Sequence, residues 1–197
     1  MGQPDLKKYY SIEEYFELEQ NNEERHEYYN GEVFAMAGAT LNHNRLVQNV
    51  TFSLRPHAKK KGCGVFSENV KLEAISGIYY PYPDVMFTCD PNDLKENLFI
   101  RRPSLIVEVL SESTALYDHD FKLRQYKTIR SLQYYMLVSQ YEVRVELFSR
   151  LNDFQWQYED FVELSQNINL EKLGIILSLE DIYDDVNFIS VRESNNH

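Results

Sequence analysis

Hydrophobic and polar residues follow two different periods along the chain, and each change of period marks a predicted element. Residues 12–21 have apolar side chains at helical spacing behind Ser11-x-x-Glu14, the spacing of a capping box, so we predict a helix there. Downstream, Asn30-Gly31 separates two short apolar runs, which is the strongest short-range signal for a β-hairpin. The N-terminal part is therefore expected to be a helix followed by a hairpin.

A longer helical pattern begins near residue 43 and ends before Gly62. Its apolar positions are Leu46, Val47, Val50 and Leu54. Three cations, Lys59, Lys60 and Lys61, suit the negative end of the helix dipole, and Gly62 suits the position after a helix C-terminus. Pro56 is expected to end the regular part of this helix or to kink it.

The middle of the chain contains four runs typical of strands, with one helix between the third and the fourth. The runs are residues 63–75, 83–90, 104–112 and 133–140. The third is almost entirely apolar, as in a strand buried on both faces. The intervening helix spans residues 118–131, with Asp118 as its expected N-cap and Lys127 and Arg130 in its last turns.

The last part of the chain alternates apolar and polar residues. Residues 143–162 predict an antiparallel hairpin that turns at Leu151-Asn152-Asp153, and residues 170–185 end in a short helical segment. No segment resembles a linker, so residues 1–197 form one predicted α/β domain with a mixed sheet.

Composition narrows the class of protein and its surroundings. With 43% hydrophobic and 26% charged residues, the chain resembles an ordinary globular protein. Its N-terminus lacks the apolar region of a secretory signal, and no apolar run approaches the roughly 18 residues of a membrane span. The two cysteines, Cys63 and Cys89, lack metal-binding spacing. We therefore expect a cytoplasmic protein with two reduced cysteines and no membrane contact.

The net charge of −11 gives the protein no general attraction to nucleic acid. Any binding of nucleic acid therefore requires local basic patches, a metal ion that neutralises carboxylates, or both.

Two carboxylates interrupt the apolar strands. Asp84 follows Pro83 at the start of one strand, and Glu108 lies between Val107 and Val109 in another. A buried carboxylate is costly unless it is paired, hydrogen-bonded or bound to a metal. Neighbouring carboxylates could share a divalent cation, and Lys122 on the next helix could orient a water or stabilise a developing anion.

Each residue also has a structural interpretation. Glu108 could be a strand-end glutamate paired with Arg124 or Lys122, and Asp84 could cap a turn before its strand. Lys122 alone would be a solvated helix lysine. The combination of the three carries the chemical hypothesis.

In their order and spacing, "YPDVMFTCD", "PSLIVEVLSEST" and "YDHDFKLRQY" resemble the Uma-type restriction-endonuclease-like family, within the PD-(D/E)xK nuclease superfamily. The resemblance covers most of the chain and implies a core of helix, three strands, helix and strand over residues 43–138. It implies that Asp84 and Glu108 are the acidic residues of the motif. Residue 110, where the simplest motif has lysine, is leucine, and the resemblance places the lysine at Lys122.

The resemblance also implies site roles for two upstream residues. Glu32 would complete a metal site, and His43 would do so or contact phosphate, although His43 could equally bond locally at the helix start and Glu32 could bridge to a cation. Asp118 is an additional candidate. Candidates for phosphate contact are Lys59, Lys60, Lys61, Arg101 and Arg102, whose usual role would be solvated surface charge.

The leading hypothesis is a DNA endonuclease that uses Mg²⁺ or Mn²⁺, with Asp84, Glu108 and Glu32 as metal ligands and Asp84, Glu108 and Lys122 as catalytic residues. The first alternative is a catalytically inactive nucleic-acid-binding or regulatory module on the same fold. The second is a dimeric interaction protein without a nucleic acid partner. Abundant tyrosines and exposed strand edges favour a homodimer.

Overall fold

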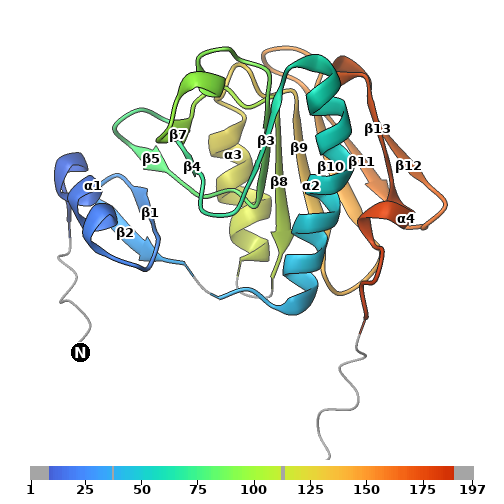
Figure 1. The fold of residues 1–197 in the computed structure, drawn as a ribbon, viewed down its shortest axis with the longest axis horizontal. Coiled ribbons are helices and arrows are strands. Elements are labelled where there is room, and N and C mark those ends of the chain that lie inside the picture. The colour runs from blue at the N-terminus through green and yellow to red at the C-terminus, as the bar shows by residue number, and fades with distance from the viewer. Residues whose placement is uncertain (1–8, 37, 112–113, 189–197) are drawn as a thin grey trace, which may run out of the picture.

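The computed structural model describes residues 9–36, 38–111 and 114–188 (Figure 1). Its N-terminal unit begins with α1 (Ile12–Asn21), whose capping box between Ser11 and Glu14 is confirmed. A three-stranded antiparallel sheet follows, in the order β2-β1-β5. Its strands are β1 (His26–Tyr29), β2 (Glu32–Ala35) and β5 (Tyr79–Tyr80). The predicted hairpin at Asn30-Gly31 is confirmed, and both turn residues have positive φ.

The main sheet has six strands in the order β11-β10-β9-β8-β6-β3. They are β3 (Gly64–Ser67), β6 (Val85–Thr88), β8 (Leu105–Leu110), β9 (Tyr134–Ser139), β10 (Val145–Arg150) and β11 (Trp156–Phe161). β8 and β9 pair in parallel, whereas the other neighbours pair antiparallel. The predicted mixed sheet is therefore confirmed, and so is the C-terminal hairpin, which is β10 and β11.

Two layers of apolar side chains cover the two faces of this sheet. On one face α2 (Leu41–Lys61) packs against alternate strand residues such as Val85 and Val107. On the other face Met86 and Ile106 pack with Tyr126 of α3 (Leu123–Tyr126). Figure 1 shows α2 and α3 on opposite sides of the sheet. The order α2, β3, β6, β8, α3, β9 is the predicted core of helix, three strands, helix and strand.

Shorter elements complete the fold. They are β4 (Lys71–Leu72) paired with β7 (Phe99–Ile100), β12 (Asn167–Leu170) paired with β13 (Ile175–Ser178), α4 (Leu179–Ile182), a π-helical turn (Tyr117–Lys122) that leads into α3, and two 3₁₀ turns (Asp93–Lys95 and Glu171–Leu173).

Several sequence expectations were wrong in detail. α2 continues through Pro56 to Lys61, so Pro56 does not end the helix: Pro56 lies on the exposed side while Ala58 anchors the last turn in the core. A kink at Pro56 stays a prediction. The run 63–75 breaks where Glu68 and Asn69 take positive φ, so it forms β3 and β4 instead of one strand.

The two ends of the predicted helix 118–131 also differ. Asp118 lies inside the π-helical turn and is buried, so it is not the N-cap, and regular helix ends at Tyr126. The helical end of the C-terminal segment is present as α4, but the preceding β12–β13 hairpin was not anticipated.

The expectation of two reduced cysteines was wrong, because Cys63 and Cys89 form a disulfide. The antiparallel register of β3 and β6 pairs Gly64 with Thr88, so the flanking cysteines lie directly opposite one another, with Cα atoms 4.3 Å apart. The expected cytoplasmic location rested partly on reduced cysteines, so it loses that support and stays a prediction. In the part of the chain that the structure describes, no helix is long and apolar enough to cross a membrane.

Candidate functional site

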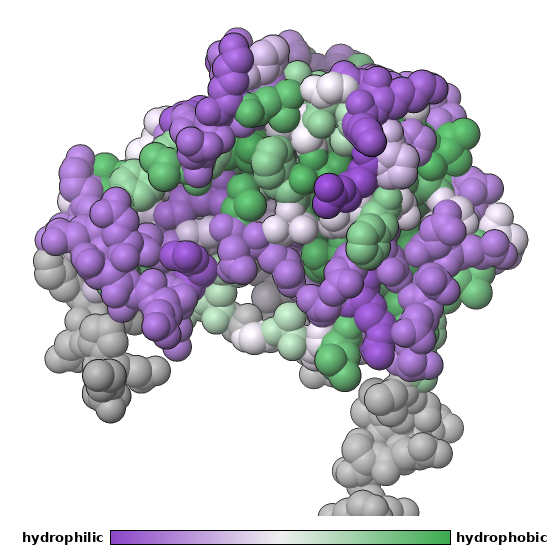
Figure 2. Space-filling model, viewed as in Figure 1, coloured by the Kyte–Doolittle hydropathy of each residue, from purple (hydrophilic) through white to green (hydrophobic). Residues whose placement is uncertain are grey.

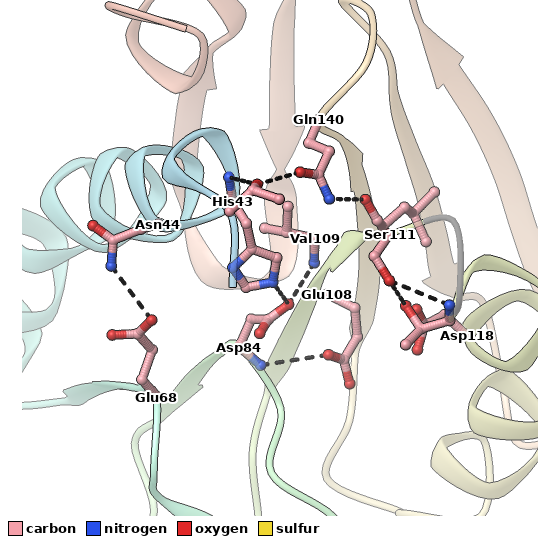
Figure 3. A network of polar contacts seen from close by, with 12 residues as sticks. His43, Asn44, Glu68, Asp84, Glu108, Val109, Ser111, Asp118 and Gln140 are labelled. Carbon is pink, nitrogen blue, oxygen red and sulfur yellow. Dashed lines mark hydrogen bonds and ion pairs between the residues drawn. The ribbon is translucent and has the colours of Figure 1, made fainter. Parts of the chain in front are cut away.

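The pairing of β6 with β8 brings Asp84 and Glu108 together. Val85 pairs with Val107 in antiparallel register, so the preceding Asp84 faces Glu108. The Asp84 main-chain N–H lies 3.4 Å from Glu108 Oε2, and Asp84 Oδ2 accepts a 2.7 Å hydrogen bond from the Val109 N–H (Figure 3). The sheet itself therefore holds the two carboxylates side by side.

Glu108 points away from α2, toward the layer that contains α3. Strand residues alternate between faces, and Val107 and Val109 pack on the α2 side. Glu108 is only 3% exposed. Its Oε1 accepts hydrogen bonds from Lys122 Nζ at 3.1 Å and from the Tyr126 hydroxyl at 2.9 Å. The structure thus brings Asp84, Glu108 and Lys122 together, as expected from the sequence.

Lys122 is the cation at the centre of an acidic cluster. Besides Glu108, its Nζ contacts Asp118 Oδ1 at 3.1 Å and Glu27 Oε1 at 3.8 Å. Burial lowers the pKa of Lys122, but the carboxylates of Glu108, Glu27 and Asp118 outweigh it and hold the pKa well above its ordinary value. Lys122 therefore stays charged and cannot act as a base at neutral pH.

Glu108 experiences the opposite balance. Burial raises its pKa most, Lys122 opposes this effect, and the charges of Asp84, Asp118 and Glu27 raise the pKa further, so that it lies well above the ordinary value. The site therefore has more negative charge than one lysine balances. A proton or a cation would relieve this excess.

His43 approaches Asp84 from the N-terminal end of α2. Its Nε2 lies 3.3 Å from Asp84 Oδ2. Burial is the largest single effect and lowers the pKa of His43, but the hydrogen bond to Asp84 and the charges of Asp84, Glu68 and Asp118 together raise the pKa overall. Thr40 caps α2 by accepting a hydrogen bond from the His43 N–H and donates to Gln140 Oε1 at 2.5 Å. Figure 3 shows His43 pointing at Asp84 while Gln140 braces the helix start.

These side chains line a cleft of about 600 Å³ between the N-terminal unit and the main sheet. Asp84, Glu108, Asp118 and Lys122 belong to its lining, together with Glu27 of β1. Asp118 and Lys122 are buried although both are charged, because they form an ion pair with one another. The cleft concentrates the polar chemistry of the sequence in one place.

Glu27 is the site residue that sequence reasoning missed. It lines the cleft and accepts a 3.3 Å hydrogen bond from the Tyr82 N–H, two residues before Asp84. The predicted Glu32 instead lies beside the hairpin turn, is exposed, and is not among the described residues that line the cleft. Strand alternation could have pointed to Glu27: it lies between His26 and Tyr28, which are buried, so the Glu27 side chain projects from the other face of β1.

The five predicted phosphate contacts also lie away from the cleft. Lys59, Lys60 and Lys61 end α2, roughly 25 Å from His43 at the rise of a helix. Lys61 Nζ donates to a carbonyl oxygen near Gly174.

Arg101 is paired with Glu73 and Glu96, and Arg102 with Asp90. The Arg102 carbonyl oxygen accepts a hydrogen bond from the Thr88 hydroxyl, at the end of β6 opposite Asp84. The structure does not bring either arginine to the acidic cluster.

The donor set suits a hard divalent cation. Within residues 9–36, 38–111 and 114–188, no three His, Cys, Asp or Glu side chains form a ready metal-binding group. Mg²⁺ is commonly held by only one or two carboxylates, with water and substrate phosphate in its remaining positions. Asp84 and Glu108 fit that description, and a bound cation would relieve the crowding that raises the pKa of Glu108.

Comparisons with known proteins agree with this fold. The family model Uma2, described as "Putative restriction endonuclease", matches residues 12–180. Two proteins of Synechocystis sp., named as uncharacterized proteins slr1290 and sll1609, are each 34% identical, over 88% and 80% of this chain and 90% and 89% of their own lengths.

A crystal structure from Anabaena variabilis, described as a "putative nuclease belonging to DUF820", superposes with a TM-score of 0.70 at 16% identity, covering 88% of this chain and 97% of the other. It confirms the restriction-endonuclease-like fold expected from the sequence. The match of the family model over most of the chain, with relatives that align nearly end to end, shows that the chain belongs to the Uma2 family.

Proposed function

We propose that this protein is a divalent-metal-dependent nuclease that hydrolyses phosphodiester bonds, with DNA as its substrate. The observation that carries the proposal is the contact of Asp84, Glu108 and Lys122 at the floor of one cleft. Membership of a family described as restriction endonucleases supports the same reaction class. Fold likeness alone would not, since one fold serves many functions.

Each residue has a separate task in this proposal. Asp84 and Glu108 would hold Mg²⁺ or Mn²⁺, which supplies Lewis-acid activation of water and neutralises phosphate charge. Lys122, held charged by three carboxylates, opposes the rise in the Glu108 pKa and places a positive charge beside the reacting phosphate. Glu27 takes the place predicted for Glu32, and His43 orients Asp84 through its Nε2 contact.

Cleavage assays on plasmid, oligonucleotide and RNA substrates test the proposal. Wild type with Mg²⁺ or Mn²⁺ is expected to cut DNA, and Asp84→Asn and Glu108→Gln are expected to lose at least 100-fold in rate, roughly the scale of one essential electrostatic contact. Asp120→Asn is the matched control, because Asp120 is exposed, forms an ion pair with Arg124, and is not among the described residues that line the cleft. Equal cutting by all four proteins would remove this site from the reaction.

Two observations favour the alternative function, a non-catalytic nucleic-acid-binding or regulatory module. The described residues offer no three-ligand metal group, and Lys122 is fully engaged by carboxylates. DNA binding without cutting in either metal, with no metal affinity by calorimetry, would favour that module. The homodimer stays a prediction, which sedimentation equilibrium can test.

A further inference from the structure

An apolar lip borders the cleft on the side of the N-terminal unit. It consists of Phe34, Ala35 and Met36, all of which line the cleft. Phe34 is 47% exposed and Met36 is 40% exposed, although both side chains are large and hydrophobic. Figure 2 shows pale and green surface along the segment that joins β2 to α2, at the lower edge of the view, beside hydrophilic surface of the N-terminal unit.

The register of the hairpin places this apolar lip next to the proposed chemistry. Phe34 pairs directly with Glu27 across β1 and β2. Directly paired residues of an antiparallel sheet project on the same face, with Cβ atoms about 5 Å apart. Glu27 in turn contacts Lys122, so one strand pair connects the exposed aromatic ring to the acidic cluster.

The charges of the cleft make such an apolar contact important. Among the described residues, six carboxylates line it, from Glu23, Glu27, Glu68, Asp84, Glu108 and Asp118, against three basic side chains, Arg25, Lys122 and His43. Even with a divalent cation bound, the lining attracts phosphate weakly. Affinity for nucleic acid at this cleft must therefore come from another part of the nucleotide, and the bases have apolar faces.

We propose that the apolar lip stacks on an unpaired nucleobase beside the scissile phosphate, so that the site acts on single-stranded or locally unpaired nucleic acid. This inference rests on the proposed nuclease function and names its substrate class. Within a duplex, base faces are covered by neighbouring bases and are out of reach of a side chain unless the helix opens. A single strand presents its base faces freely, and stacking on an aromatic ring tolerates any base.

Binding measurements under non-cutting conditions test the proposal. Fluorescence anisotropy with Ca²⁺ in place of Mg²⁺ would compare a labelled single strand, its duplex, and a duplex with an unpaired flap. Phe34→Ala is expected to weaken single-strand and flap binding roughly 5- to 100-fold, the range for loss of one stacked base, and to leave duplex binding unchanged. Phe34→Trp is expected to preserve binding.

Phe154→Ala is the matched control, since Phe154 is 94% exposed at the β10–β11 turn and does not line this cleft. Equal single-strand binding by wild type and Phe34→Ala, or tighter binding of wild type to duplex than to single strand, would overturn the proposal. A dimer that dissociates in Phe34→Ala without any change in nucleic acid binding would also overturn it, because β2 would then be an edge that pairs with a second copy.

Cleavage assays in parallel separate this proposal from the nuclease function. If wild type and Phe34→Ala cut and bind all substrates equally, the apolar lip has no such role and the nuclease function stands. If wild type neither binds nor cuts any nucleic acid, both proposals fail. Circular dichroism of Phe34→Ala excludes misfolding, which is not expected for a half-exposed side chain.

Discussion

Replacing Lys122 by methionine should reveal how strongly the acidic cluster depends on one cation. Lys122→Met keeps the length and apolar stem of the side chain but removes the charge that contacts Glu108, Asp118 and Glu27. Removing one partner of a buried ion pair typically costs about 3–5 kcal/mol, because the other charge stays buried and uncompensated. We therefore expect the free energy of unfolding at pH 8 to fall by about that amount.

The loss should depend on pH in a defined direction. The pKa of Glu108 is raised in the folded state, so folded Glu108 binds its proton more tightly than the unfolded chain does, and stability falls as pH rises from the ordinary glutamate pKa through the raised value. Lys122 opposes that shift, so its removal raises the Glu108 pKa further. The difference between wild type and Lys122→Met should therefore be small near pH 5 and largest near pH 8.

Urea denaturation between pH 5 and 8 measures this difference. Arg124→Met is the matched control, because its ion pair with Asp120 on the same helical segment is 65% and 68% exposed and should contribute less than about 1 kcal/mol. The double variant Lys122→Met with Glu108→Gln should recover much of the loss. A Lys122→Met loss below about 1 kcal/mol that does not change with pH would refute the reasoning.

Three other predictions concern the frame around the site, each measured by chemical denaturation. Changing Cys63 and Cys89 to serine should lower the free energy of unfolding by about 3.5 kcal/mol, the contribution of the loop that the bond closes. A reductant should cause the same loss in wild type and no loss in the variant. Gly64→Ala should cost about 1–3 kcal/mol, because a Cβ there would lie 2.6 Å from a phenylalanine ring carbon, whereas Gly38→Ala meets nothing within 4 Å and should be neutral. Arg150→Lys should lower the free energy of unfolding by about 2 kcal/mol, because the guanidinium donates to three main-chain carbonyl oxygens that an ammonium cannot reach together. A loss no larger than that of Arg102→Lys would contradict this reasoning.

The sequence was most informative where local chemistry and tertiary structure agree. The capping box at Ser11, the Asn30-Gly31 turn and the order of core elements all follow from short-range patterns. The contact of Asp84 with Glu108 was also predictable, because carboxylates in apolar strands need partners. Lys122 was reached through the family resemblance, and the structure supplies the contact that the sequence could not show.

Features that depend on register or on packing were beyond the sequence. Glu32 pairs with Tyr29, two residues after Glu27, so both glutamates project on the same face of the hairpin and alternation does not choose between them. Glu32 differs by its place beside the turn, where it is exposed and is not among the described residues that line the cleft. The disulfide needs the pairing of β3 with β6, and the passage of α2 through Pro56 needs the core to hold its last turn. Neither the spacing of the cysteines nor helix propensity contains that information.

The disulfide gives the chain an unusual connectivity around the site. α2 and β6 meet at one end through His43 and Asp84 and are joined at the other end by Cys63 and Cys89. Residues 63–89 therefore form a covalent ring that contains Asp84. A protease that nicks this ring once between Cys63 and Asp84 would leave both fragments linked, so the cut chain would migrate as one band on a denaturing gel. A reductant would then separate the fragment that carries His43 from the one that carries Asp84.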